Sequence, residues 1–397
     1  MQENGYKPGL EGVIAAETRL SHVDGQRGEL IIAGQRVEEL APQASFEAVV
    51  FLLWNGRFPT PSEEAEFMAD LASRRQLPAA TMQLLTAVAP KQIPPMDALR
   101  MAAATLDLDN PSDNLALAKT LLARIPTIVA AYNRLRHGQP PIAPDPALGQ
   151  AANYLQMLEG KRPSAARSRA LETYLNTVID HSLNASTFTA RVIIATQSDM
   201  VSAIVGAIGA LKGPLHGGAP GPALDMVFEI GTLDRAEPYL RQKLEAGERL
   251  MGFGHRVYKV RDPRAEVLAT AAEHLFAADG DKSLYELAKG VEKTAVSLLA
   301  AYKPGRNLQT NVEFYTALLL HGAGLETALF TPTFAIGRTA GWIAHCFEQL
   351  KNGRLIRPSA RYVGAYPAEK GLAVDNPNTT RNGDYQSGTI PLPGMGE

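Results

Sequence analysis

Histidines with unusual neighbours are the first candidates for chemistry in this chain, because an imidazole can move protons near neutral pH. His216 lies in the run GPLHGG at residues 213–218, where a proline and glycines predict a tight turn whose backbone can approach a ligand closely. The alternative is an ordinary turn after a helix, with an incidental histidine. Five other histidines lack neighbouring glycines or clustered polar groups, and we expect them to be surface or satisfied core residues: His22, His137, His274, His321 and His345.

A second imidazole of interest, His255, lies in the run GFGHRVYKVRDPR at residues 252–264. The run also holds two glycines and several cations: Gly252, Gly254, Arg256, Lys259, Arg261 and Arg264. Cations at this density beside glycine N–H groups are typical of a loop that holds phosphates or carboxylates. The alternative is a solvated basic turn. The run therefore predicts an anion-binding loop that carries a proton donor.

Taken together, three runs resemble the catalytic segments of citrate synthase, in the same order: GPLHGG, GFGHRVYKVRDPR and NVEFY at residues 311–315. The run DHSLNAST, from Asp180, resembles the oxaloacetate-binding stretch of that family. Further matches are PGLEGV near the N-terminus, FAIGRTAGWIAH from Phe334, and IRPSARYVG up to Gly364. The resemblance to this family covers nearly the whole chain except its C-terminal tail.

The resemblance implies an enzyme that condenses an acyl-CoA with a 2-oxo acid and then hydrolyses the thioester. In such a reaction a carboxylate removes a proton from the methyl group of acetyl-CoA, and a donor stabilises the oxygen of the forming enol. Glu313 and His216 match those two positions, and His255 matches the proton donor to the ketone of oxaloacetate. The resemblance also implies no metal and no permanently bound cofactor, with acetyl-CoA or propionyl-CoA as co-substrate.

The residues that match the family's oxaloacetate contacts are His181, Arg264, Arg338 and Arg357. Planar guanidinium groups suit this substrate because they bind carboxylates in a bidentate way. In the family the arginine that matches Arg357 reaches in from the neighbouring subunit, so we expect a homodimer or a larger homo-oligomer. The small residues of the run at 201–211 allow close helix approach, either at such an interface or within one subunit.

The candidates for CoA come mainly from the basic loop: the backbone near Gly252 and Gly254, the cations Arg256, Lys259 and Arg261, and also Arg306. Each of these cations has an alternative interpretation as an exposed surface charge.

Two positions depart from the commoner family pattern. The usual NVDF reads NVEF here, with Glu313 in place of aspartate, and the usual GGAN reads GGAP, with Pro220 in place of asparagine. An extra methylene can displace the carboxylate by ~1 Å, which can cost on the order of 10²-fold in rate unless the backbone compensates. Because the other matching residues are intact, we expect a working enzyme with a resized site.

Three functions stay open at this point. The first is citrate synthase, and the second is 2-methylcitrate synthase, which uses propionyl-CoA. The two acyl groups differ by one methylene, which is worth only ~1–3 kcal/mol in an apolar pocket. The second function therefore includes activity with both acyl donors. The third is a binding or structural paralogue of low activity, suggested by the glutamate at 313.

The elements that must position these groups are mostly helices. Thr60 can cap a helix whose N3 residue is Glu63, and Ser45 with Gly56 can begin and end the preceding helix. A helix from Asp113 carries Pro126 in its interior, which predicts a kink or a split into two halves. The strand signal is confined mainly to a hairpin around the turn at 24–28.

We therefore predict an all-α, two-domain fold with a minor N-terminal β-hairpin, and the resemblance implies the division. The large helical domain comprises 1–218 and 319–369, the inserted small domain comprises 219–318, and the site lies in the cleft between them. Residues 370–397 are rich in Gly, Pro, Asn and Thr and are expected to form an arm or a disordered tail.

The composition excludes several classes of protein. With 39 basic and 41 acidic residues, the chain lacks the positive charge that nucleic-acid binding favours. Its single cysteine, Cys346, rules out a disulfide framework within one chain, which fits a reducing cytoplasm. We read neither an export signal nor a membrane span in the sequence.

Overall fold

The computed structural model describes residues 6–106, 113–217, 221–254, 258, 260–279 and 281–364. The chain divides into two units, residues 1–356 and 357–397. The first unit holds every helix and strand named below, and the described residues of the second, 357–364, contain neither.

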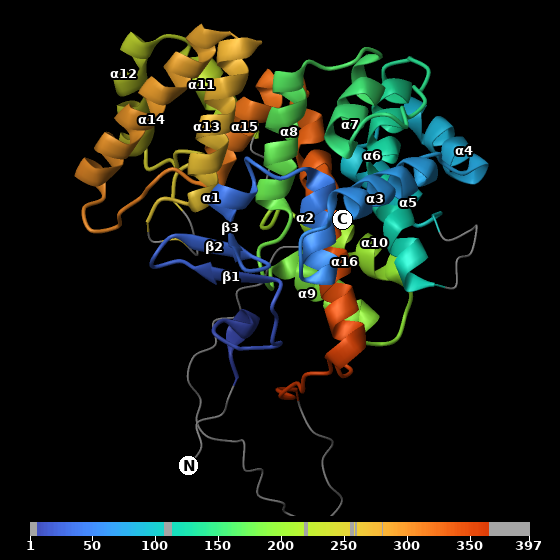
Figure 1. Ribbon diagram of the computed structural model, residues 1–397. Helices are drawn as coiled ribbons and strands as arrows, with labels where there is room; N and C mark the ends of the chain where they lie inside the picture. The colour runs from blue at the N-terminus through green and yellow to red at the C-terminus, as the bar shows by residue number, and fades with distance from the viewer. Residues whose placement is uncertain are drawn as a thin grey trace, which may run out of the picture. The chain divides into compact units, whose positions relative to one another are not determined.

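Helices dominate the first unit, as the predicted fold class requires (Figure 1). In chain order the α-helices are α1 (Val37–Leu40), α2 (Phe46–Asn55), α3 (Pro61–Arg74), α4 (Ala79–Val88), α5 (Pro95–Ala103), α6 (Asn114–Arg136), α7 (Gln150–Glu159), α8 (Ala165–Val178), α9 (Ala185–Ile194), α10 (Met200–Leu211), α11 (Gly221–Ile230), α12 (Ala236–Glu245), α13 (Pro263–Ala278), α14 (Lys282–Tyr302), α15 (Val312–Gly322) and α16 (Phe330–Asn352). Short 3-10 helices cover Pro8–Leu10, Ala89–Lys91, Leu233–Arg235 and Thr327–Leu329.

The predicted hairpin is present and is extended by a third short strand. Strands β1 (Ser21–Asp24) and β2 (Glu29–Ile32) pair antiparallel, with Ser21 opposite Ile32 and Asp24 opposite Glu29. Strand β3 (Gln35–Arg36) then pairs antiparallel with β2. Leu30 and Ile32 are fully buried, so one face of this sheet packs on the helical core.

The predicted caps of α2 and α3 are confirmed. The side chain of Ser45 accepts a hydrogen bond from the N–H of Ala48, and Gly56 ends α2 in the left-handed conformation. At α3, Thr60 and Glu63 form a reciprocal capping box.

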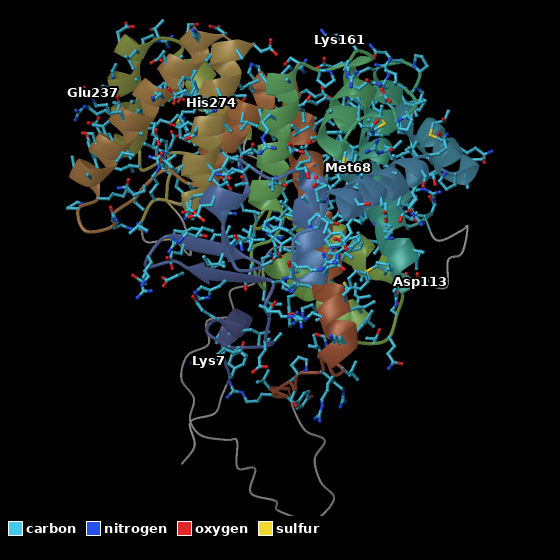
Figure 2. The ribbon with its side chains drawn as sticks, in the orientation of Figure 1. Lys7, Met68, Asp113, Lys161, Glu237 and His274 are labelled. Carbon is cyan, nitrogen blue, oxygen red and sulfur yellow. The ribbon has the colours of Figure 1, made fainter. Side chains whose placement is uncertain are left out.

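The predicted split of α6 is wrong, because the helix runs unbroken through Pro126. Asp113, labelled in Figure 2, caps the first turn of α6 by accepting from the backbone N–H groups of Leu115 and Ala116. A proline removes the hydrogen bond to the carbonyl four residues earlier, but the carbonyl of Leu122 accepts instead from Nε2 of Gln150 at 2.7 Å. A side chain from α7 thus replaces the missing backbone donor, and tight packing keeps the helix in one piece.

By length and composition α6 would also pass for a membrane-spanning helix. However, 78% of its apolar window is buried inside the protein. It packs against α3, α5, α7 and α16, as a helix at the centre of a core does.

Helix α16 organises the core around the predicted site. It packs against α2, α6, α8, α9 and α10, and α8 in turn packs against α7 and α13 (Figure 1). Helices α11 to α15 lie mainly in the predicted small domain, whose boundaries stay a prediction. Helices α13 and α15 pack against α8, so residues from both parts of the sequence meet along α8. The predicted tail at 370–397 lies outside the described residues.

Candidate active site

Residues 213–217 of the run GPLHGG form the predicted tight turn directly after α10. The N–H groups of His216 and Gly217 both donate to the carbonyl of Gly213, at 2.9 and 3.1 Å. A Cβ on Gly217 would lie 2.2 Å from the carbonyl oxygen of Leu211, so only glycine fits there. The turn thereby fixes the backbone position from which the side chain of His216 extends.

The imidazole of His216 is held at one end by α9. Its Nε2 lies 2.7 Å from Oγ of Ser186 and accepts from the N–H of the same residue at 3.4 Å. The indole of Trp342 on α16 donates to that hydroxyl at 3.0 Å. Because a backbone N–H can only donate, Nε2 must carry a lone pair, and the proton of a neutral ring is on Nδ1.

The same imidazole is neutral at physiological pH. Burial, and secondarily the charge of Arg338, lower the pKa of His216 to about 4. A neutral ring with its proton on Nδ1 is a hydrogen-bond donor that can stabilise a forming enolate oxygen without being a strong acid.

Two predicted carboxylate clamps, Arg338 and Arg264, are almost fully buried. The Nε of Arg338 donates to the carbonyl of Val178 at 2.6 Å, and its guanidinium lies 4.7 Å from the ring centre of Phe334. Burial lowers the pKa of Arg338 to about 10, despite the attraction of Asp180. A desolvated cation of this kind gains when an anion reaches it.

Arg264 lies at the start of α13 and is paired with Asp262 through two hydrogen bonds, of 3.1 and 2.8 Å. Burial pulls the pKa of Arg264 down, but the charge and hydrogen bonds of Asp262 outweigh it and raise the pKa. The guanidinium also lies 5.8 Å from the ring centre of Tyr258. Because Asp262 accepts from the backbone N–H of Arg264 as well, the arginine is fixed to the helix end.

His181 is linked to the basic loop through Tyr258. Its Nε2 lies 3.1 Å from the hydroxyl of Tyr258, and the two rings meet edge to face with centres 5.8 Å apart. A predicted oxaloacetate contact from one part of the sequence and a loop residue from another are therefore in direct contact.

The segment before α15 is joined to the GFG part of the loop by backbone hydrogen bonds. The N–H of Gly254 donates to Gln309 at 2.7 Å, and the N–H of Asn311 donates to Gly252 at 3.0 Å. A Cβ on Gly252, whose φ is +85°, would lie 2.9 Å from Cβ of Phe314. The glycine therefore allows two predicted catalytic runs to approach one another.

Glu313 lies in the first turn of α15, where its N–H donates to Oδ1 of the N-cap residue Asn311 at 2.9 Å. The side-chain amide of Asn311 also donates to the carbonyl of Gly254 at 2.9 Å, which fixes the helix start to the loop. Burial raises the pKa of Glu313, and the charge of Arg264 opposes that rise. A carboxylate with a raised pKa is a stronger base, which suits proton abstraction from a carbon acid.

The structure thus brings together five of the predicted site residues, through direct contacts or through the electrostatic effects described above: His181, His216, Arg264, Glu313 and Arg338. His255, Arg256 and Lys259 lie outside the described residues, as does Pro220. Arg357 is exposed and belongs to the second unit. The roles of these residues stay predictions.

Arg261 faces carboxylates in this structure. Its guanidinium is 2.9 Å from Glu266 and 3.1 Å from Glu292, which already balance its charge. Arg306 is exposed in the loop before α15. These surroundings favour a structural role for Arg261 over phosphate binding, whereas Arg306 keeps the accessibility that a CoA contact needs.

Sequence reasoning missed the residues that support the site from beneath: Ser186, Trp342, His345 and Asp180. His345 is a satisfied core residue, one of the two predicted alternatives, because it is fully buried and bonded to Asp180 and Arg191; its place beneath His181 was not predicted. The available signal was the spacing of Gly337, Gly341 and His345, because residues four apart share one helix face.

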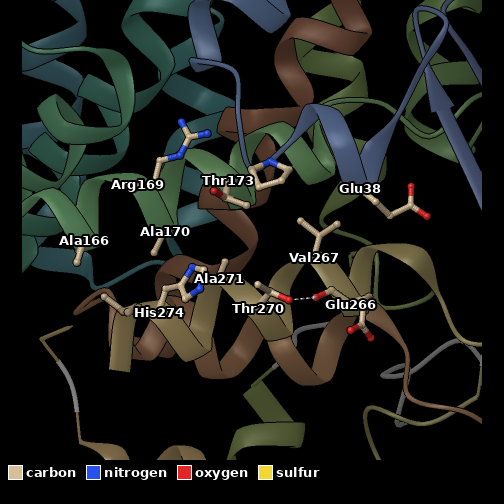
Figure 3. Close-up of a pocket in the computed structure, with 12 residues that line it drawn as sticks. Glu38, Ala166, Arg169, Ala170, Thr173, Glu266, Val267, Thr270, Ala271 and His274 are labelled. Atoms are coloured by element: carbon tan, nitrogen blue, oxygen red, sulfur yellow. Dashed lines mark hydrogen bonds between the residues drawn. The ribbon is translucent and has the colours of Figure 1, made fainter. Parts of the chain in front are cut away.

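A separate groove, of about 330 Å³, lies between α1, α8 and α13 (Figure 3). Its lining includes Glu38, Arg169 and Thr173 on one side and Thr270 and His274 on the other. None of the five residues brought together in the site lines this groove, so the groove is separate from the candidate catalytic residues.

Comparison with known proteins adds an independent result. The sequence profile of a family described as "Citrate synthase, C-terminal domain" matches residues 9–359. The chain is 41% identical to a citrate synthase from Synechocystis over 366 residues, covering 90% of this chain and 91% of that protein. It is 39% identical to a 2-methylcitrate synthase from Mycobacterium tuberculosis over 366 residues, covering 90% of each.

A solved structure is similar as well. It is the ternary complex of citrate synthase from Thermoplasma acidophilum with carboxymethyl-coenzyme A and oxaloacetate. The two chains share 30% identity with a TM-score of 0.82, over 92% of this chain and 98% of that one.

Proposed function

Because this chain belongs to the citrate synthase family, we propose that it condenses acetyl-CoA with oxaloacetate and hydrolyses the resulting thioester to citrate and CoA. The observation that carries the proposal is the pairing of chemistries in the site. His216 is a neutral donor fixed by Ser186, and Glu313 is a partly buried carboxylate with a raised pKa. Deprotonation of a thioester methyl group needs a donor and a base of this kind.

The buried cations bind the 2-oxo acid. Arg338 and Arg264 are desolvated, and Arg264 lies beside Tyr258, which contacts His181. A dianion that enters the site therefore gains strong charge-assisted hydrogen bonds. Arg357, from the neighbouring subunit, would complete the set, as the family resemblance implies.

The first chemical step is removal of a methyl proton from the acyl-CoA. The carboxylate of Glu313 takes the proton, and Nδ1–H of His216 donates to the thioester oxygen as negative charge gathers there. The nucleophilic carbon of the enol then attacks the ketone of oxaloacetate, forming the carbon–carbon bond. The ketone oxygen takes a proton, for which His255 is the donor that the resemblance implies. Water then cleaves the thioester and releases CoA.

The glutamate at 313 is compatible with this role. It lies in the first turn of a helix, where the helix dipole favours a negative charge. Its backbone is fixed by Asn311, which itself is bonded to the loop at Gly254. A longer side chain on a fixed backbone changes the reach of the carboxylate and keeps its charge, so we propose a resized working site.

The second candidate function is 2-methylcitrate synthesis from propionyl-CoA. The observation that favours it is the 39% identity to the M. tuberculosis enzyme of that name, close to the 41% identity to the Synechocystis citrate synthase. The difference between the two acyl groups is one methylene, worth ~1–3 kcal/mol in an apolar pocket. Activity with both donors is part of the proposal.

We propose that the enzyme acts as at least a homodimer, since Arg357 is expected to serve the neighbouring site. The small-residue face of α10 does not by itself point to an interface. Ala203 and Ala207 are buried within the chain, and a Cβ on Gly206 would meet Ile193 of α9 at 2.2 Å. Size-exclusion chromatography with light scattering should show more than the 42.7 kDa chain, and an active monomer alone would contradict the dimer. We further propose a cytoplasmic location.

The activity is tested by giving the purified protein oxaloacetate with either acetyl-CoA or propionyl-CoA and following free thiol. The two kcat/KM values decide between the candidates. No thiol release with either donor would sink the enzymatic proposal, and a ratio strongly in favour of propionyl-CoA would make 2-methylcitrate synthesis the main function.

A further inference from the structure

A set of buried polar side chains lies directly beneath the turn that carries His181. Asp180 and His345 are both fully buried. Nε2 of His345 lies 3.2 Å from one carboxylate oxygen of Asp180 and 3.3 Å from the other. The hydroxyl of Ser21, the first residue of β1, donates to the same carboxylate at 2.5 Å. Strand β1, the turn after α8 and helix α16 therefore meet at one carboxylate.

The direction of these hydrogen bonds is fixed by Arg191. Its Nη1 lies 3.0 Å from Nδ1 of His345, and a guanidinium can only donate. Nδ1 therefore accepts, and the proton of the neutral imidazole is on Nε2, where it donates to Asp180. Arg191 is itself held by Glu348 at 2.7 Å and Gln349 at 3.1 Å. The ring of His345 has one orientation and one tautomer.

The same groups fix the backbone on both sides of His181. The N–H of Ser182 donates to the hydroxyl of Ser21 at 2.7 Å, and Ser182 has a φ of +53°, a left-handed conformation that is uncommon outside glycine. Asp180 on the other side is anchored by Ser21 and His345. His181 is thus presented by a strained turn whose two neighbouring residues share one anchor.

The carboxylate also acts on the predicted clamp Arg338. Asp180 attracts its guanidinium, while the Nε of Arg338 is bonded to the carbonyl of Val178. Burial alone would raise the pKa of Asp180, but His345, Arg338 and Ser21 together lower it, so the carboxylate is ionised in the folded protein. One buried charge is therefore adjacent to two of the groups that the proposed function assigns to oxaloacetate.

We infer that Asp180 and His345 are positioning residues for the 2-oxo acid, which hold His181 and Arg338 in the geometry that binds its carboxylates. The inference rests on the proposed function. A buried carboxylate held by hydrogen bonds is weak support for stability, since an apolar core of the same shape is often as stable. Its placement under the substrate contacts indicates a role in orienting them.

The test compares His345→Leu, which removes both ring nitrogens, with His345→Gln, whose amide can still donate to Asp180. Tyr132→Phe is the matched control, because that buried hydroxyl donates to the carbonyl of Ile93 at 2.6 Å, in a part of the fold without site residues. For His345→Leu we expect the KM for oxaloacetate to rise on the order of tenfold or more and the KM for acetyl-CoA to change less than about twofold. His345→Gln should recover most of this loss.

Ser21→Ala is a milder variant that keeps the test available if His345→Leu fails to fold, and its KM for oxaloacetate should rise several-fold. Calorimetric titration with oxaloacetate alone should show the same order of affinities. The inference is overturned if the variants lose only thermal stability, as we expect of Tyr132→Phe, or if the KM values for both substrates rise equally. Wild-type protein that releases no thiol and binds no oxaloacetate would instead sink the proposed function.

Discussion

Replacement of Gly341 by alanine tests how closely α16 must approach the segment that carries His181. A Cβ at this position would lie 2.3 Å from the carbonyl oxygen of Ile179 and 2.9 Å from Oδ1 of Asp180. Real Cβ atoms essentially never come within 3.0 Å of such neighbours. The helix and the segment must therefore separate by about 0.7 Å or more before the contact is tolerable.

That displacement reaches the site because α16 also carries Arg338 and His345. A misplacement of ~1 Å can cost on the order of 10²-fold in rate, so we expect kcat/KM for oxaloacetate to fall by roughly 10-fold to 10²-fold. Overpacking should also lower the free energy of unfolding by roughly 1–3 kcal/mol, less the ~1 kcal/mol that alanine gains over glycine in a helix.

The assay is thiol release at varied oxaloacetate and saturating acetyl-CoA, together with urea unfolding followed by circular dichroism. Gly209→Ala in α10 is the control, because its new Cβ would meet only Cδ of Arg100, at an ordinary 3.9 Å. The control should keep its activity and gain up to ~1 kcal/mol of stability. If folded Gly341→Ala protein keeps the wild-type kcat/KM for oxaloacetate, the close approach of α16 is not needed and the reasoning is refuted.

Three further predictions follow from the site and the core. Glu313→Gln should lower kcat by about 10²–10⁴-fold because the base is lost, whereas Glu313→Asp should lower kcat less. If thiol release shows equally small changes in kcat for both variants, Glu313 is not the base. The protein should lose stability as the pH falls from about 6.5 to about 4, because in that window His216 binds a proton in the unfolded state but stays neutral in the folded state. Urea unfolding at successive pH values measures this loss. An unchanged pH dependence in His216→Gln would contradict it. Gln150→Met should lower the free energy of unfolding by about 1–3 kcal/mol, because it leaves the Leu122 carbonyl without a donor. Adding Pro126→Ala should recover part of this loss by supplying a backbone N–H. If the urea midpoint shows no recovery, this account of α6 is wrong.

Local elements were predictable where the signal lies in a few neighbouring residues. The capping box of Thr60 and Glu63, the left-handed end of α2 at Gly56 and the tight turn around His216 all depend on contacts within about one turn of chain. The positions of the catalytic runs came from resemblance to a family, and the structure adds how two of them join, through backbone hydrogen bonds between Gly254 and the segment before α15.

Contacts between distant segments were not predictable from local pattern. Pro126 reads as a helix breaker because its missing donor is local, while the compensating donor, Gln150, comes from another helix. His345 reads as an ordinary histidine because neither Asp180 nor Arg191 is near it in the sequence. A buried polar group needs a hydrogen-bond partner, but a single sequence does not identify that partner when it comes from a distant segment.

The polar anchor beneath His181 also bears on how the protein assembles in time. Asp180 is bonded to Ser21 and to His345, across separations of 159 and 165 residues. Contacts that close such large loops are costly in chain entropy and form late in folding. During synthesis the carboxylate of Asp180 lacks its donor from α16 until nearly the whole described chain has been made. We therefore expect refolding protein to regain its helices before it regains affinity for oxaloacetate, with the substrate contacts completed in the final step.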